Sequence, residues 1–275
     1  MKKMLIDVHT HSTFSHDGQN SLGEMLAAAL EKGVAFYGVS EHFDYDYDIS
    51  KMSKEEFEST RNAAPEDYFH AARHLQEDYE GCMNVLVGAE FGYSDEEKVK
   101  KLYQETYEKY RPDYVINSVH GIGGEDFVRC AFNGSEKETY EMYLSLIRRS
   151  LDAPYPYDIV GHIEYVVRYV PFENRAIDLT AFQEQIDDIL KTIIQKDKIL
   201  EINSATKTLP RLSLPNEAIL RRYYELGGRK ISFGSDAHFK ERILDKWEQI
   251  VGLVKEIGFT YFTVPCRGEH IKVEL

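Results

Sequence analysis

The sequence lacks several features that would each mark a particular class of protein. Only three cysteines occur among 275 residues, and Cys82, Cys130 and Cys266 share no metal-binding spacing. They fit a reducing compartment better than a disulfide framework. No apolar run has spanning length, and the opening Met-Lys-Lys leads directly into a short predicted strand rather than a signal peptide. We therefore expect a cytoplasmic protein without a membrane partner.

Positive charge is also scarce, with 33 Lys and Arg against 47 Asp and Glu and a net charge of −14. A nucleic-acid surface needs clustered Lys and Arg, so a nucleic-acid polymer is disfavoured as partner. Bound cations would offset part of the acidity. Gly121-Ile-Gly-Gly124 lacks the Lys and Ser/Thr of a phosphate-binding P-loop, and no Gly-x-Ser-x-Gly elbow indicates a serine nucleophile.

Short β-rich runs alternate with helical patterns along the chain, without an internal repeat. This alternation predicts βα units around a mainly parallel sheet, in one barrel domain spanning residues 1–275. We expect residues 43–65 to form a lid or substrate-side wall, residues 125–136 a loop, and 241–257 the last helix. The predicted strands lie within 4–11, 35–39, 85–90, 114–120, 158–162, 199–203 and 230–236, with a final strand-like piece at 261–264.

The first predicted strand ends in two histidines, His9 and His11. Side chains two residues apart on an extended chain point to the same face, so the two histidines can bind one metal ion together. The C-terminal ends of the strands are where TIM-type barrels keep their chemistry. Taken alone, a His-x-His pair is as often one buried histidine and one loop histidine.

The later strands end in the same residue types, and six of the ten histidines lie at strand ends. Core or capping roles would leave a costly cluster of buried charge, so we interpret the pattern as a metal site. The residues at these later ends are Glu41, His42, Glu90, His120, His162, Glu201, Asn203, Asp236 and His238.

Mixed nitrogen and oxygen ligands suit Zn, Mn, Fe or Co, and the absence of cysteine ligands argues against a purely structural zinc. A carboxylate such as Glu90 can bridge two cations about 3.5–4 Å apart, which activates a shared water for phosphate-ester hydrolysis. Phosphoryl transfer also needs positive charge, which Arg168, Lys207 and Arg211 could supply from loops at the same end.

The ordered set of motifs resembles the PHP (polymerase and histidinol phosphatase) family over nearly the whole chain, most closely its stand-alone histidinol-phosphate phosphatases. The resemblance implies a distorted (β/α)7 TIM-like barrel, three divalent metal ions (Zn, Mn or Fe) and hydrolysis of L-histidinol phosphate in histidine biosynthesis. The motifs are Asp7-Val-His-Thr-His-Ser12, Phe14-Ser-His-Asp-Gly18, Ser40-Glu-His42, Gly88-Ala-Glu90, Ser118-Val-His120, Gly161-His162 and Gly234-Ser-Asp-Ala-His238.

The resemblance also implies a ligand set, carried over position by position. The first metal would be held by His9, His11, Glu90 and Asp236, the second by Glu90, His120 and His162, and the third by Asp17, His42 and His238. His16 is the alternative to Asp17.

A hydroxide bridging two metals, held in place by Glu90, would attack phosphorus. Asp17, His238 or a metal-bound water would protonate the leaving alkoxide.

Further residues are implied as substrate contacts. Arg168 matches a phosphate-binding arginine, and Lys207 or Arg211 stands near a second such position. Three more would support the ligands or touch the substrate: Ser118, Glu41 and Asn203. As a separate hypothesis, the acids and tyrosines of residues 43–48, including Asp44, Asp46 and Asp48, could receive the cationic head of histidinol.

Two other functions remain open from the sequence. One is a phosphoesterase of the same family acting on nucleotides or other small phosphate esters. The other is a metal-binding scaffold without catalysis, which the complete ligand set disfavours. The sequence also leaves open whether the chain forms a homo-oligomer.

Overall fold

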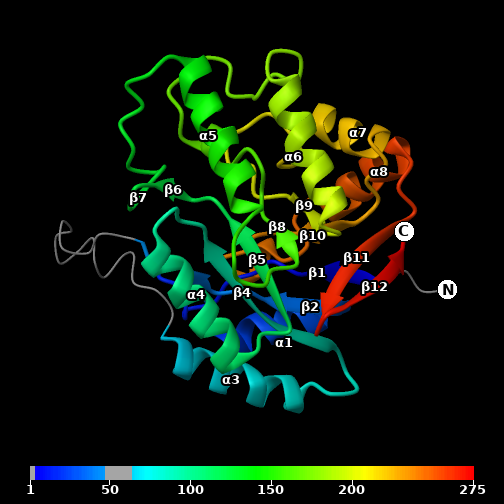
Figure 1. The fold of residues 1–275 in the computed structure, drawn as a ribbon. Helices are drawn as coiled ribbons and strands as arrows, with labels where there is room; N and C mark the ends of the chain where they lie inside the picture. The colour runs from blue at the N-terminus through cyan, green and yellow to red at the C-terminus, as the bar shows by residue number, and fades with distance from the viewer. Residues whose placement is uncertain (1–3, 47–63) are drawn as a thin grey trace.

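In the computed structural model, which describes residues 4–46 and 64–275, seven parallel strands form one sheet that nearly closes on itself (Figure 1). The order is β1-β2-β4-β5-β8-β9-β10, and a short β3 (His42–Phe43) pairs with β4. The bounds are β1 Leu5–Asp7, β2 Val34–Val39, β4 Asn84–Gly92, β5 Tyr114–Ser118, β8 Ile159–Val160, β9 Ile199–Asn203 and β10 Ile231–Gly234.

The last strand and the first are joined by backbone contacts that close the barrel. Val8 N–H donates to the carbonyl of Phe233 at 3.1 Å, and Thr10 forms a parallel bridge with Ala237. The strands are buried on both faces, as expected for a parallel sheet covered by helices. In the barrel interior, the Tyr114 hydroxyl donates a hydrogen bond to the Val8 carbonyl at 2.7 Å. The predicted (β/α)7 barrel is therefore confirmed.

Helices cover the outside of the barrel (Figure 1). A capping box is present at the start of α1, because Ser21 and Glu24 bond each other's backbone amides. The helices are α1 Leu22–Glu31, α3 Pro65–Asp78, α4 Glu97–Tyr110, α5 Glu136–Ser150, α6 Gln183–Gln195, α7 Glu217–Glu225 and α8 Trp247–Ile257, with 3-10 turns η2 Tyr165–Arg168 and η3 Lys240–Arg242.

Two predicted segments differ from the structure, and a third lies mostly outside the described residues. The helix expected from 241 begins only at Trp247, because Leu244 and Lys246 adopt positive φ angles of 63° and 57° that interrupt a helix. The chain after β5, where the sequence predicts a loop over residues 125–136, contains a small hairpin of β6 (Gly121–Ile122) and β7 (Glu125–Asp126). Most of the predicted lid, residues 47–63 with Asp48, lies outside the described residues.

The chain ends in an antiparallel hairpin of β11 (Tyr261–Cys266) and β12 (Glu269–Glu274). The sequence indicates β11 but not its partner, because β12 is largely polar. The hairpin joins the starts of two distant strands: Arg267 bonds Asp113, just before β5, and His270 lies 2.7 Å from Lys230, just before β10. It thus ties together the barrel end opposite the strand C-termini.

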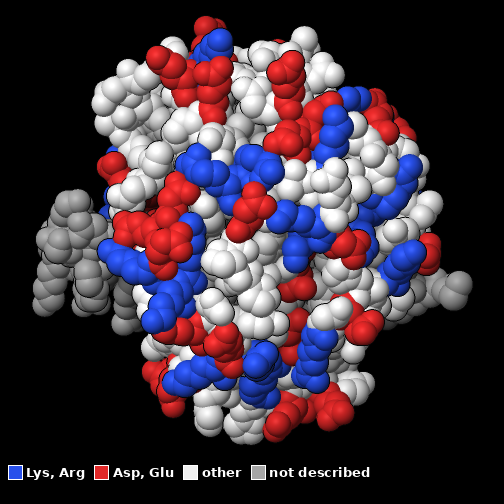
Figure 2. Space-filling view, viewed as in Figure 1, with Lys and Arg blue, Asp and Glu red and all other residues white. Residues whose placement is uncertain are grey.

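No helix within residues 4–46 and 64–275 is long and apolar enough to cross a bilayer. On the face drawn in Figure 2, Lys and Arg alternate with Asp and Glu rather than forming a basic stripe.

Asp113 anchors the terminal hairpin to the barrel. Its side chain is only 1% exposed, and Oδ1 accepts bonds from Arg73 and Arg267, each at 2.8 Å. Oδ2 accepts from Val87 N–H at 2.9 Å and Gln76 Nε2 at 2.7 Å. Burial favours the neutral acid, but the bonds from Arg267, Val87 and Arg73 outweigh it and lower the pKa of Asp113.

Replacing Asp113 by Asn should lower the free energy of unfolding by about 2–4 kcal/mol at pH 7, because an amide NH2 would face donors. The folded pKa lies below the unfolded value, so the carboxylate stabilises above about pH 4 and loses its effect as pH falls. Urea unfolding at pH 7 and at about pH 3 should therefore show the difference shrinking. Arg267→Ala, at a side chain 67% exposed, should cost less than about 1 kcal/mol. Equal unfolding free energies for wild type and Asp113→Asn at pH 7 would contradict this role.

Candidate metal centre

The strand C-termini bring the predicted metal ligands into one cluster centred on Glu90. This glutamate lies near the C-terminal end of β4 and is fully buried. The cluster draws on segments that follow β1, β2, β5, β8 and β10, as a parallel barrel allows. Its members are His9, His11, Asp17, His42, Glu90, His120, His162, Asp236 and His238.

One set of ligand atoms surrounds the Oε2 atom of Glu90. The Nε2 atoms of His9 and His11 lie 3.1 Å apart, and 3.3 and 3.6 Å from that oxygen. Asp236 Oδ1 lies 3.9 and 3.5 Å from the same two nitrogens. Tetrahedral bonds near 2.1 Å would space ligand atoms about 3.4 Å apart, so these four atoms are spaced as for one divalent ion.

A second set surrounds the other oxygen of Glu90. Oε1 lies 2.9 Å from His162 Nε2 and 3.1 Å from His120 Nε2, and these two nitrogens are 3.3 Å apart. The two carboxylate oxygens therefore face two different sets of imidazoles. This is the arrangement a bridging carboxylate requires.

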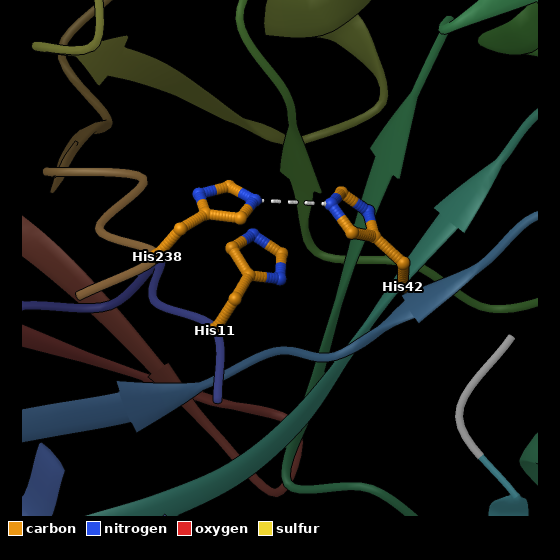
Figure 3. A group of neighbouring side chains, drawn as sticks. All are labelled: His11, His42 and His238. Carbon is orange, nitrogen blue, oxygen red and sulfur yellow. Dashed lines mark hydrogen bonds between the residues drawn. The ribbon is translucent and has the colours of Figure 1, made fainter. Parts of the chain in front are cut away.

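A third set is formed by His42 and His238, whose Nε2 atoms meet at 3.4 Å (Figure 3). Asp17 completes it, with oxygens 3.0 Å from His238 Nε2 and 3.8 Å from His42 Nε2. The His11 ring stacks on both, at centroid distances of 4.1 and 4.3 Å, so the sets are continuous. His16 Nε2 lies 4.0 Å from the Asp17 carboxylate. This geometry favours Asp17 over His16 as the third member.

Buried carboxylates behind the imidazoles fix their orientation. Glu201 Oε1 lies 2.5 Å from His9 Nδ1, and its Oε2 accepts the backbone N–H of His162 at 2.6 Å. Asp44 Oδ1 lies 2.8 Å from His120 Nδ1. When Nδ1–H donates to a carboxylate, the Nε2 lone pair is left for a metal. Both rings therefore present Nε2 to the cluster.

Two glycines make room for these supporting carboxylates. A Cβ atom on Gly92 would lie 1.8 Å from Asp44 Oδ1, and one on Gly234 would lie 2.2 Å from Glu201 Oε1. Any side chain at either position would displace the carboxylate. The glycines at the ends of β4 and β10 are thus explained by close approach rather than by a turn.

The cluster balances its charges internally. Burial disfavours a charged imidazole, but the Glu201 and Glu90 carboxylates overcome it and hold the pKa of His9 well above its usual value. Burial, with His42 and His238 nearby, holds the pKa of His11 well below its usual value. Protons on some imidazoles thus compensate the carboxylates, and metal ions would take over that role.

The donor set fits divalent cations. All ligand atoms are nitrogen or oxygen, and groups such as His9, His11 and Glu90 lie within 4.8 Å of one another. The buried Oε2 of Glu90 accepts no hydrogen bond from the described residues. His42 Nδ1 is 2.9 Å away, but out of hydrogen-bonding geometry. A buried anionic oxygen without a donor is expected where a cation binds.

A cavity of about 280 Å³ opens onto the cluster and carries three cationic side chains. Arg168 is held by Asp236 at 3.2 Å and Asn203 at 3.1 Å. Lys207 Nζ donates to the Tyr169 hydroxyl at 2.7 Å. Arg242 is the third cation, and sequence reasoning missed it because that segment reads as helix. The cavity also has three aromatic residues in its wall, Tyr165, Tyr169 and Phe239.

The sequence leaves three residues undecided, either as supports for the metal ligands or as contacts for the substrate. In the structure, all three lie behind the ligands. Ser118 Oγ donates to Glu90 Oε1 at 2.6 Å, and Asn203 Nδ2 lies 3.3 Å from Asp236 Oδ2. Both oxygens of Glu41 accept bonds from Ser12 and Ser15, so it fixes the loop that carries Asp17. Glu41, Ser118 and Asn203 are fully buried and do not line the cavity.

Two further expectations change with the structure in view. Arg211 does not line the cavity; it pairs with buried Glu164 at 3.2 Å, which leaves Lys207 as the nearer partner of Arg168. Asp44 is buried against His120 and so supports a ligand rather than receiving a substrate head. A loop position alone does not show which way a side chain points.

A (β/α)7 barrel with a cluster of candidate metal ligands at the C-terminal ends of its strands defines a class of proteins. Comparisons with known proteins identify the family within this class. The PHP domain family matches residues 7–205, so the chain belongs to the PHP family. A probable histidinol-phosphatase of Clostridium acetobutylicum is 30% identical over 87% of this chain and 89% of its own length. The histidinol-phosphatase of Lactococcus lactis is 27% identical over 94% and 93%.

Solved structures share the fold. The histidinol phosphate phosphatase of Lactococcus lactis, crystallised with zinc, L-histidinol and phosphate, superposes with a TM-score of 0.83 at 24% identity, covering 98% of this chain and 100% of that one. A putative histidinol phosphatase of Listeria monocytogenes gives a TM-score of 0.77 at 22% identity, covering 89% and 99%. These similarities extend over the whole barrel.

Replacing Gly92 by Ala should weaken metal binding by about 10–100-fold, because the new methyl group would push Asp44 away from His120. A competition titration with a chromophoric chelator measures this. Gly252→Ala is the matched control, because Gly252 lies exposed in α8 with nothing within 4 Å of the added Cβ. Unchanged affinity in Gly92→Ala, at an unchanged melting temperature, would show that Asp44 does not support the site.

Proposed function

We propose that the protein is a metal-dependent phosphomonoesterase that hydrolyses L-histidinol phosphate to L-histidinol and phosphate. The observation that carries the proposal is the position of Glu90, whose two oxygens face two sets of imidazoles beneath a cavity with cationic walls. The relatives of Clostridium acetobutylicum and Lactococcus lactis, which align over 87% and 94% of this chain, are named as a probable histidinol-phosphatase and a histidinol-phosphatase, and this supports the choice of substrate.

Three divalent ions, of Zn, Mn or Fe, are proposed for the three sets of ligand atoms. When bound, they would supply the Lewis acidity and the activated water that phosphate-ester hydrolysis needs. The chain's part is to hold the ligands rigidly. Glu201 and Asp44 orient His9 and His120, and Ser118 fixes the shared carboxylate of Glu90.

The cavity walls are suited to the phosphate group. Arg168 offers a planar guanidinium whose position is set by Asp236 and by the ring of Tyr165, 4.9 Å away. Lys207 stands on the same wall, supported by Tyr169. Cations fixed before the substrate arrives stabilise developing charge on phosphate oxygens without reorganisation.

The leaving alkoxide needs a proton, and the place where Asp17 and His238 meet is open to the solvent that can supply one. Their side chains meet at 3.0 Å, and both line the cavity. Asp17 is the most exposed of the nine cluster residues, at 47% of its side chain, which gives it access to solvent protons. Because both side chains are also proposed ligands of the third ion, the proposed acid is a water held at this cavity mouth rather than either side chain itself.

Phosphate release from L-histidinol phosphate, a nucleoside monophosphate and an aryl phosphate should be compared on protein loaded with Zn or Mn. We expect kcat/KM for L-histidinol phosphate of about 10⁴ M⁻¹s⁻¹ or more, well above the other two. His42→Ala should abolish turnover while the far-ultraviolet circular dichroism spectrum is retained. Comparable weak turnover of all three esters would reject histidinol phosphate and favour the nucleotide alternative.

Metal release should occur in two phases, because the three sets differ in exposure. The side chains of His9, Glu90 and His162 are at most 2% exposed, whereas His238 and Asp17 are 22% and 47% exposed. A chelator should remove one ion on the order of tenfold faster than the rest. Stopped-flow absorbance of a coloured chelator measures both rates and needs no assay of activity. A single rate for all ions would contradict the three-site proposal.

A further inference from the structure

Two loops carry the cavity cations, and a buried ion pair outside the cavity joins them. Glu164 begins the 3-10 turn η2, which ends at Arg168. Arg211 lies four residues after Lys207 in the loop that follows β9. The carboxylate of Glu164 and the guanidinium of Arg211 meet at 3.2 Å, with side chains 0% and 14% exposed. The pair is thus linked through short backbone segments to both cations.

The carboxylate of Glu164 accepts several hydrogen bonds besides its ion pair. Its Oε1 also accepts from Ile177 N–H at 3.1 Å and Asn216 Nδ2 at 2.9 Å, while Oε2 accepts from Asn216 N–H at 2.5 Å. Its backbone φ is +80°, an angle that a residue with a side chain keeps only when its surroundings enforce it. The backbone at the start of η2 is therefore set by this carboxylate.

Arg211 is likewise fixed by two further hydrogen bonds, one from its guanidinium and one to its backbone carbonyl. Its Nη2 donates to the carbonyl of Arg175, and its own carbonyl accepts from Thr206 Oγ1 at 3.1 Å. Lys207, between Thr206 and Arg211, has a φ of +51°. Fixing Arg211 thus fixes the tight turn that presents Lys207 to the cavity.

We propose that the Glu164–Arg211 ion pair is a positioning device that sets the placement of Arg168 and Lys207 and so determines affinity for the phosphate group. The inference rests on the proposed phosphatase function. Neither residue of the pair lines the cavity. Both act through others, so they are positioning residues rather than catalytic ones.

Three variants separate this role from the alternatives. Arg211→Met and Glu164→Gln each break the pair from one side, and the double variant removes both charges. A single variant leaves a buried polar partner unsatisfied and should lower the melting temperature, whereas the double variant should recover most of it. Positioning predicts that KM rises about tenfold in all three, with kcat changing less than about threefold.

Each competing explanation predicts a different pattern. If the pair only stabilises the fold, KM will follow the melting temperature and return to the wild-type value in the double variant. If Arg211 instead binds phosphate directly, Glu164→Gln will free it, and KM will stay the same or fall. Either result overturns the proposal. Lys207→Ala provides the reference for losing a cavity cation outright.

Inorganic phosphate serves as the second probe. Its inhibition constant, measured on the metal-loaded protein with whichever ester is turned over, should rise with KM in each variant. This readout keeps the inference separate from the choice of substrate, because it does not need L-histidinol phosphate. Arg222→Met is the matched control: Arg222 joins α7 to Asp187 of α6 at 2.7 Å, and neither residue lines the cavity. It should lower stability slightly and leave KM and phosphate inhibition unchanged.

Discussion

The structure depends on one buried negative charge, the carboxylate of Glu90. A fully buried carboxylate is stable only if positive groups surround it, whether protons on imidazoles or metal ions. No single segment could supply enough partners on both of its sides. The barrel solves this by bringing His9, His42, His120 and His162 to Glu90 from different strand ends.

Rigidity of the cluster comes from a layer of acids and small residues behind the ligands. Glu201 and Asp44 orient imidazoles, and Gly234 and Gly92 leave the space these carboxylates need. The cavity cations have a different kind of support, because they lie on loops. There, the hydrogen bonds of Glu164 replace the regular ladder of the sheet. The candidate metal ligands thus lie in the strands or on the segments that follow them, whereas the cavity cations depend on side-chain hydrogen bonds within longer loops.

Much of this could be predicted from the sequence, and the exceptions have physical causes. His9 and His11 are readable because the period of a strand places them on one face. Asp44 could not be assigned, because its partner His120 lies 76 positions away and the pairing depends on the fold. Arg242 was hidden by a helical pattern that positive φ angles at Leu244 and Lys246 interrupt. Arg211 shows that the direction in which a loop cation points cannot be predicted from the sequence, because it depends on a partner, here Glu164, that only the fold brings near.

The two ends of the barrel perform separate tasks with similar chemistry. At the base, Asp113 accepts four bonds and ties the terminal hairpin to the sheet. At the opposite end, Glu90 likewise uses both oxygens, but its partners are imidazoles that can exchange protons for cations. The contrast lies in the partners: Arg73 and Arg267 stay charged at every relevant pH and make a permanent joint. Imidazoles can give up a proton and bind a metal ion instead, so a carboxylate surrounded by them forms a site suited to exchanging protons for cations.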